Sequence, residues 1–93
     1  RVERQLMDKL LVSALIEARS CERFRLLSEK LPQPELRKFY RHFMESEAGH
    51  YTLFMKLAKR YMPSKVVNER WKSMLEEEKR ILQTLEVSGS RIH

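Results

Sequence analysis

Two residue types that bind metals stand three positions apart, as Glu47 and His50, in the middle of a long helical pattern. On a helix, residues three apart leave the same face, so both side chains can reach one ion. Carboxylates and imidazoles are common ligands of transition metals. Because a buried carboxylate without a partner is destabilising, Glu47 is expected to be paired, protonated or bound to a metal.

The helix that carries this pair is predicted over residues 35–62. When each residue advances by about 100°, its apolar side chains fall on the same stripe as Glu47 and His50. They are Leu36, Phe39, Tyr40, Phe43, Phe54, Leu57, Ala58 and Tyr61. The two polar side chains therefore lie at the centre of a largely aromatic stripe.

A second carboxylate lies on the apolar face of a helix predicted over residues 2–29. The face is marked by apolar residues at spacings of three, four and seven, namely Leu6, Leu10, Ala14, Cys21 and Phe24. Glu17 falls between Leu10 and Phe24 on this face, whereas Glu22 falls towards its edge. Glu17 is thus the better candidate for an inward-facing ligand.

The segment Leu31-Pro32-Gln33-Pro34 separates the two helices, since proline prevents helix continuation and favours extended geometry in the residue before it. The helices are therefore expected to form an antiparallel hairpin. Glu17 precedes Glu29 by 12 residues and Glu47 follows Glu35 by 12, which puts each roughly 18 Å from the turn. Glu22 would be only about 10 Å from it. The register predicts that Glu17, Glu47 and His50 converge.

A third helix is predicted over residues 65–87, after the break at Met62-Pro63-Ser64, with Ser88-Gly89-Ser90 as its stop and residues 88–93 as a tail. With two Gly, three Pro and many Leu, Glu, Lys and Arg residues, the composition predicts an all-α protein. Residues 1–93 are expected to form a single helical domain or a fragment of a longer protein, because the chain begins at Arg1 rather than Met.

The chain has 19 Lys and Arg residues against 13 Asp and Glu, a formal net charge of +6 that would attract a polyanion such as nucleic acid. These charges are interleaved with Glu, so ordinary solvated helix faces explain them equally well. A single Cys excludes an internal disulfide and a Cys-rich zinc site. No apolar run approaches the roughly 20 residues of a membrane span, so no membrane partner and a cytoplasmic location are expected.

One Glu on a first helix and a Glu-x-x-His on a second form half of the ligand set of ferritin-like di-iron bundles. The other half would come from an upstream hairpin or from a second copy of the chain. Two alternatives remain open. Besides a di-iron enzyme, the protein could be a ferritin- or rubrerythrin-like protein that binds or oxidises iron, or a metal-free interaction module whose inward carboxylates pair with Arg25 or His42.

Two stretches resemble a known family. The string Leu-Ile-Glu-Ala-Arg-Ser-Cys-Glu-Arg-Phe at residues 15–24, with Glu-Ser-Glu-Ala-Gly-His-Tyr at residues 45–51 and Phe54 downstream, is similar to the tRNA hydroxylases called MiaE. The resemblance runs from about Leu6 to Tyr61. It implies a ferritin-like di-iron fold, of which this chain would be the C-terminal half, and O2-dependent hydroxylation of the isopentenyl group of a hypermodified adenosine in tRNA.

The resemblance also implies site residues and partners. Glu17, Glu47 and His50 would bind iron, with two irons in each completed site, and Glu22 would be an outer or alternative ligand. An electron donor would be required. Phe43, Tyr51 and Phe54 would either line a pocket for the prenyl chain or pack in the core. From charge alone, the residues expected to bind tRNA phosphates are Arg37, Lys38, Arg41, Lys56, Lys59 and Arg60.

Overall fold

The computed structural model describes the backbone of residues 1–92 and the side chains of residues 1–85. Within this range the chain folds into three long helices, α1 (Val2–Lys30), α2 (Pro34–Tyr61) and α3 (Ser64–Ile92), which confirms the all-α expectation. Two compact units are formed, one over Arg1–Met62 and one from Pro63 onward. The expectation of a single domain over residues 1–93 stays a prediction.

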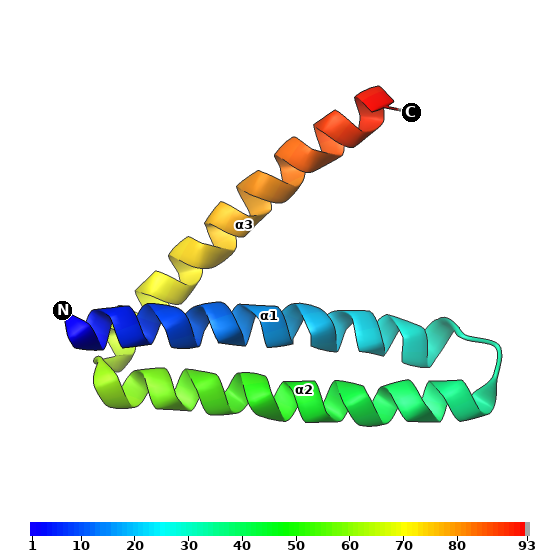
Figure 1. Ribbon diagram of the computed structural model, residues 1–93, viewed down its shortest axis with the longest axis horizontal. Helices are drawn as coiled ribbons and strands as arrows, with labels where there is room; N and C mark the ends of the chain where they lie inside the picture. The colour runs from blue at the N-terminus through cyan, green and yellow to red at the C-terminus, as the bar shows by residue number, and fades with distance from the viewer. Residues whose placement is uncertain (93) are drawn as a thin grey trace. The chain divides into compact units, whose positions relative to one another are not determined.

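The first unit is an antiparallel hairpin in which α1 and α2 lie side by side along their whole length (Figure 1). Its turn has the geometry that the prolines require: Leu31 and Gln33 each precede a proline, and both are extended, with ψ of 139° and 119°. Pro34 then begins α2, where its fixed φ suits the first helical turn. The hairpin register is therefore set by local sequence.

Arg37 reinforces the turn. Its Nη1 donates hydrogen bonds to the carbonyl oxygens of Leu31 at 2.9 Å and Pro32 at 3.0 Å. These oxygens follow the end of α1 and have no helical partner further along the chain. One guanidinium thus ties the first turn of α2 to the end of α1.

The second unit consists of α3. Met62 is extended, with φ −136° and ψ 153°, because it precedes Pro63, and this ends α2. The carbonyl of Pro63 then accepts a hydrogen bond from the amide of Val67 at 3.0 Å and begins α3. None of the helices in the described part of the chain is long and apolar enough to cross a membrane.

The prediction that the third helix ends at residue 87 was wrong, because α3 continues to Ile92. Ser88, Gly89 and Ser90 are weak helix formers, but each costs only about 1 kcal/mol or less relative to Ala. Without a proline, this cost does not outweigh the gain of continued backbone hydrogen bonds. The predicted tail is therefore helical as far as Ile92, and His93 lies outside the described residues.

Apolar burial in the hairpin is concentrated near its open end, where Met7, Leu11 and Ala14 of α1 and Ala58 of α2 are fully buried. Near the turn, aromatic rings pack across the two helices. Phe24 stacks on Tyr40 with ring centroids 5.8 Å apart. The region between these two clusters holds the polar residues considered next.

Truncating the buried end should destabilise the fold. We expect Leu11→Ala to lower the free energy of unfolding by about 2–5 kcal/mol, because it removes a fully buried side chain and leaves a cavity. The adjacent Val12→Ala is the control, because Val12 is 47% exposed, and its effect should stay within about 1 kcal/mol. Chemical denaturation followed by circular dichroism measures both. Equal losses for the two variants would contradict this assignment of the core.

Candidate metal centre

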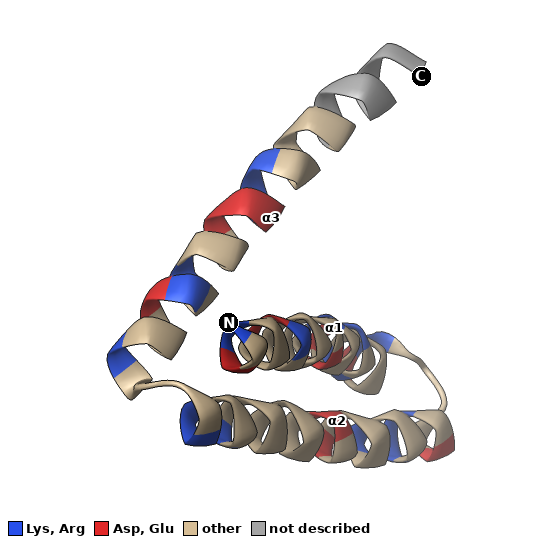
Figure 2. Ribbon diagram, turned by 60° about the vertical axis from the view of Figure 1, so that its left-hand side comes forward, with Lys and Arg blue, Asp and Glu red and all other residues tan. Residues whose placement is uncertain are grey.

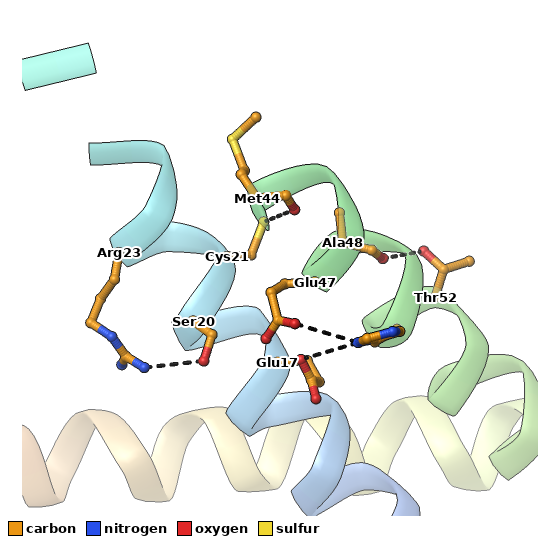
Figure 3. A network of polar contacts seen from close by, with 9 residues as sticks. Glu17, Ser20, Cys21, Arg23, Met44, Glu47, Ala48 and Thr52 are labelled. Carbon is orange, nitrogen blue, oxygen red and sulfur yellow. Dashed lines mark hydrogen bonds and ion pairs between the residues drawn. The ribbon is translucent and has the colours of Figure 1, made fainter. Parts of the chain in front are cut away.

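Three potential metal ligands meet midway along the hairpin. Glu17 projects from α1 and Glu47 from α2, and the two side chains lie close together (Figure 3). His50, three residues after Glu47 on α2, contacts both carboxylates. One ligand atom from each of the three residues lies within 4.8 Å of the other two, and no other such group occurs among the described residues. The convergence that stripe and register predict is therefore present in the structure.

The imidazole presents one particular nitrogen to both carboxylates. Nδ1 of His50 lies 3.4 Å from Oε1 of Glu47 and 3.6 Å from Oε2 of Glu17. The carboxylate side chains are 19% and 21% exposed, whereas the imidazole is 53% exposed. An ion held here would thus be bound by the protein from one side and open on the other.

One oxygen of this cluster lacks a hydrogen bond. Oε2 of Glu17 is buried, and among the described side chains it is the only buried nitrogen or oxygen without a hydrogen-bond partner. A buried acceptor left in this way costs about 1–3 kcal/mol. A metal ion would satisfy it, and two carboxylates with one imidazole are a donor set that suits iron and other divalent transition metals.

The closeness of the carboxylates raises the pKa of Glu47. The pKa of Glu47 is raised, first by a hydrogen bond to Glu17, then by burial and by the charge of Glu17, while His50 acts in the opposite direction. The hydrogen bond favours the protonated form, since one carboxyl can donate to the other. Without a metal, Glu47 therefore holds its proton more tightly than an ordinary glutamate does.

Two further hydrogen bonds lie next to the cluster, and one of them joins the two helices. The thiol of Cys21, one turn beyond Glu17, donates to the carbonyl oxygen of Met44 at 3.5 Å. Within α2, the hydroxyl of Thr52 donates to the carbonyl oxygen of Ala48 at 3.0 Å, as Figure 3 also shows. The sequence indicates an inward Cys21, but its acceptor depends on the side-chain conformation and was not predicted.

Glu22 does not join the cluster. Its carboxylate is 58% exposed and accepts a hydrogen bond from Nη1 of Arg19 at 2.8 Å. The inward carboxylates, Glu17 and Glu47, also have other partners than those expected for a metal-free interaction module. Within the described part of the chain, both pair with His50, and neither pairs with Arg25 or His42. A role for Glu22 near a metal stays a prediction.

The residues expected to bind tRNA occupy the two ends of α2, with acidic residues between them (Figure 2). Arg37 is partly buried and bonded to the turn. The other five side chains are exposed, and they are Lys38, Arg41, Lys56, Lys59 and Arg60. Their contact with a polyanion stays a prediction.

Comparison with known proteins adds independent findings. The sequence profile of the family described as tRNA-(MS2IO6A)-hydroxylase (MiaE) matches residues 1–93. A tRNA 2-(methylsulfanyl)-N(6)-isopentenyladenosine(37) hydroxylase of Pseudomonas putida is 51% identical over 57 residues, which cover 61% of this chain and 27% of the relative. The protein of the same name from Salmonella typhimurium is 49% identical over 53 residues, which cover 57% of this chain and 19% of the relative. No solved structure matches.

The raised pKa of Glu47 should make stability depend on pH. Because the pKa of Glu47 is raised in the folded chain, the folded state binds this proton more tightly than the unfolded state, and the resulting stability is lost as the pH rises through the raised pKa. We expect the Tm of the Glu47→Gln variant to exceed that of the parent chain by a few degrees at neutral pH, and the difference to shrink towards pH 4.

Thermal unfolding in chelator-containing buffer, followed by circular dichroism, measures this difference. Glu45→Gln is the control, since Glu45 is an exposed carboxylate on the same helix. A Glu47→Gln advantage that stays constant from pH 4 to pH 7 would contradict the raised pKa of Glu47.

Proposed function

Because the chain belongs to the tRNA-(MS2IO6A)-hydroxylase (MiaE) family, we propose that it supplies half of the di-iron centre of an O2-dependent tRNA hydroxylase. The observation that carries the proposal is the cluster of Glu17, Glu47 and His50 in a chain of this family. The reaction is hydroxylation of the isopentenyl group of a hypermodified adenosine. The chain matches less than a third of each relative, so further residues complete the centre.

The proposed architecture is a ferritin-like bundle. In such bundles two helices each contribute a Glu and two others each contribute a Glu-x-x-His, all projecting inward. The α1–α2 hairpin offers one set, with Glu17 as the single Glu and Glu47 and His50 as the Glu-x-x-His. A complementary hairpin would bring the second set, and the open side of the cluster is where it would dock.

Each ligand has a distinct role in this proposal. Nδ1 of His50 faces the carboxylates and would bind one iron as a neutral donor. Glu17 and Glu47 would bind as deprotonated carboxylates and supply negative charge that balances the ions. When bound, the irons supply activation of O2 with electrons from a donor protein, and the chain supplies ligand positions and a partly apolar surrounding.

Substrate binding would use two further surfaces. Phe43 and Phe54 lie on the same stripe as the ligands, where an apolar wall suits a prenyl chain. Exposed basic residues at the ends of α2, such as Lys56 and Lys59, would hold tRNA phosphates. Such contacts position the nucleic acid rather than read its sequence.

Metal binding should depend on the three clustered residues. We expect the parent chain to take up Fe(II) under anaerobic conditions, and Glu47→Gln or His50→Ala to weaken its affinity about tenfold or more, because each removes a donor atom. His42→Ala is the matched control, since His42 is exposed on the same helix and outside the cluster. Isothermal titration calorimetry measures the affinities.

If the carboxylates and imidazole only stabilise the hairpin, His50→Ala will change Tm and leave metal content unaltered. That result would favour the metal-free interaction module. Iron uptake followed by oxidation that tRNA does not influence would instead favour a ferritin-like role.

Binding of tRNA should weaken with salt. If Lys59 contacts a phosphate, Lys59→Ala should lower the slope of log K against log salt concentration by about 1, because one fewer counterion is released. Lys59→Arg keeps the charge and should keep the slope. Fluorescence anisotropy with isopentenylated tRNA at several salt concentrations measures both. An identical slope for the Ala variant would remove Lys59 from the proposed interface.

A further inference from the structure

The first helix carries a basic stripe on the side that faces away from α2, here called the outer stripe. Its members follow one another at spacings of seven, four, three and four, which keep side chains on one side of a helix. They are Val12, Arg19, Arg23, Leu26 and Lys30. The outer stripe thus holds three bases and no acid. A surface of this kind attracts a polyanion.

The contacts of a neighbouring residue show where the outer stripe points. Cys21 lies two residues from both Arg19 and Arg23, and its thiol bonds to the carbonyl oxygen of Met44 on α2. Residues two apart leave a helix about 200° apart, on nearly opposite sides. Arg23 is exposed, and Figure 3 shows it on the side of α1 away from α2. The outer stripe is therefore turned away from α2.

The outer stripe also points away from the open side of the metal cluster. Arg19 follows Glu17 by two residues, so the two side chains leave α1 on nearly opposite sides. Arg23, six residues after Glu17, is rotated from it by about 120°. Further residues that complete the cluster would approach on the side of Glu17. They would leave the outer stripe on the outside of the bundle.

The two arginines are oriented by side chains of their own helix. Nη2 of Arg23 donates a hydrogen bond to Oγ of Ser20 at 3.0 Å, and Nη1 of Arg19 donates one to Oε1 of Glu22 at 2.8 Å. The serine hydroxyl is neutral, so it orients the Arg23 guanidinium without cancelling its charge. This bond uses one of the five N–H donors of the guanidinium. The planar fork of a guanidinium matches the oxygens of a phosphate group.

The spacing of the two arginines favours a bound anion. Arg19 and Arg23 are four residues apart, and like charges at this spacing destabilise a helix. Glu22 offsets part of the repulsion, but its carboxylate is 58% exposed, and an exposed ion pair contributes little. The arginines lie about 6 Å apart along the helix axis, so each can bind its own phosphate of one strand.

The outer stripe supplies positive charge at a level where α2 has none. Arg19 lies roughly 3 Å beyond Glu17 along the axis of α1, and Arg23 roughly 9 Å beyond it. On α2, no Lys or Arg occurs between Arg41 and Lys56, and Figure 2 shows acidic residues in the middle of that helix. A nucleotide whose prenyl group reaches the cluster would bring its flanking phosphates near this level. Arg19 and Arg23 are placed to meet them.

We propose that Arg19 and Arg23 bind neighbouring phosphates of the tRNA substrate on the outer side of α1, near the level of the metal cluster. The inference rests on the proposed function, which makes tRNA the substrate. It adds two binding residues on a helix that the charge pattern of α2 does not point to. Such contacts hold the backbone of the nucleic acid and read no base.

Fluorescence anisotropy of the full 93-residue chain with isopentenylated tRNA, at several salt concentrations, tests this proposal. Arg23→Ala should lower the slope of log K against log salt concentration by about 1, and Arg19→Ala/Arg23→Ala by about 2, because each lost phosphate contact releases about one counterion fewer. Arg25→Ala is the matched control, since Arg25 is exposed on α1 but lies outside the outer stripe. Equal changes for Arg23→Ala and Arg25→Ala would overturn the proposal. Circular dichroism verifies that each variant is helical.

A lysine substitution separates geometry from charge. Arg23→Lys keeps the positive charge and should keep the slope, but it loses the planar fork. Its affinity for tRNA should therefore fall several-fold at every salt concentration. An affinity equal to that of the parent chain would overturn the bidentate contact.

The chemical nature of the anion is tested by competition with poly-L-glutamate. If Arg19 and Arg23 recognise phosphate, unlabelled tRNA should displace the labelled tRNA at a much lower concentration of charge than poly-L-glutamate does. Equal displacement would mean that the outer stripe recognises carboxylates, as on an acidic protein, and would overturn the proposal.

Two outcomes separate this inference from the proposed function. A chain that binds Fe(II) through Glu47 and His50, but whose tRNA affinity is unchanged by Arg19→Ala/Arg23→Ala, would uphold the metal centre and overturn the phosphate contacts. A chain that binds tRNA through Arg23 but takes up no Fe(II) would uphold the phosphate contacts and overturn the proposed metal centre.

Discussion

The central constraint on this protein is the proximity of two carboxylates that lie on partly buried helix faces. Glu17 and Glu47 approach His50 closely enough for both to pair with one imidazole nitrogen, yet one oxygen of Glu17 stays without a hydrogen bond. The raised pKa of the Glu47 carboxyl is one result of this proximity. A cation at the cluster, as proposed, would offset the charge of both carboxylates and give this oxygen a partner.

Much of this arrangement follows from sequence, because it depends on helical periodicity and on proline. Pro32, Pro34 and Pro63 end or begin helices through steric effects that act on their immediate neighbours. Once the turn was located, counting residues placed Glu17 and Glu47 at one level and excluded Glu22. Periodicity is reliable here because both helices run without interruption from the turn to the cluster.

Other features depend on side-chain conformation or on small energy differences, which sequence patterns do not resolve. The bonds from Arg37 to the turn carbonyls and from Cys21 to Met44 require a particular rotamer in each case. The end of α3 was misplaced because Ser88-Gly89-Ser90 weakens a helix without forbidding it. The sequence also does not show which exposed lysines and arginines contact a substrate. That depends on the shape of the surface, which charge counts do not describe.

The continuous helix between the turn and the cluster has a consequence for how such a chain can change. A single residue inserted between Pro34 and Glu47 would rotate the Glu-x-x-His pair by about 100° and shift it by about 1.5 Å along the axis. The pair would then leave the face shared with α1, even though the helix itself would remain intact. An insertion in this half of α2 would therefore disrupt the cluster, while beyond His50 the same insertion would leave the three clustered residues in place.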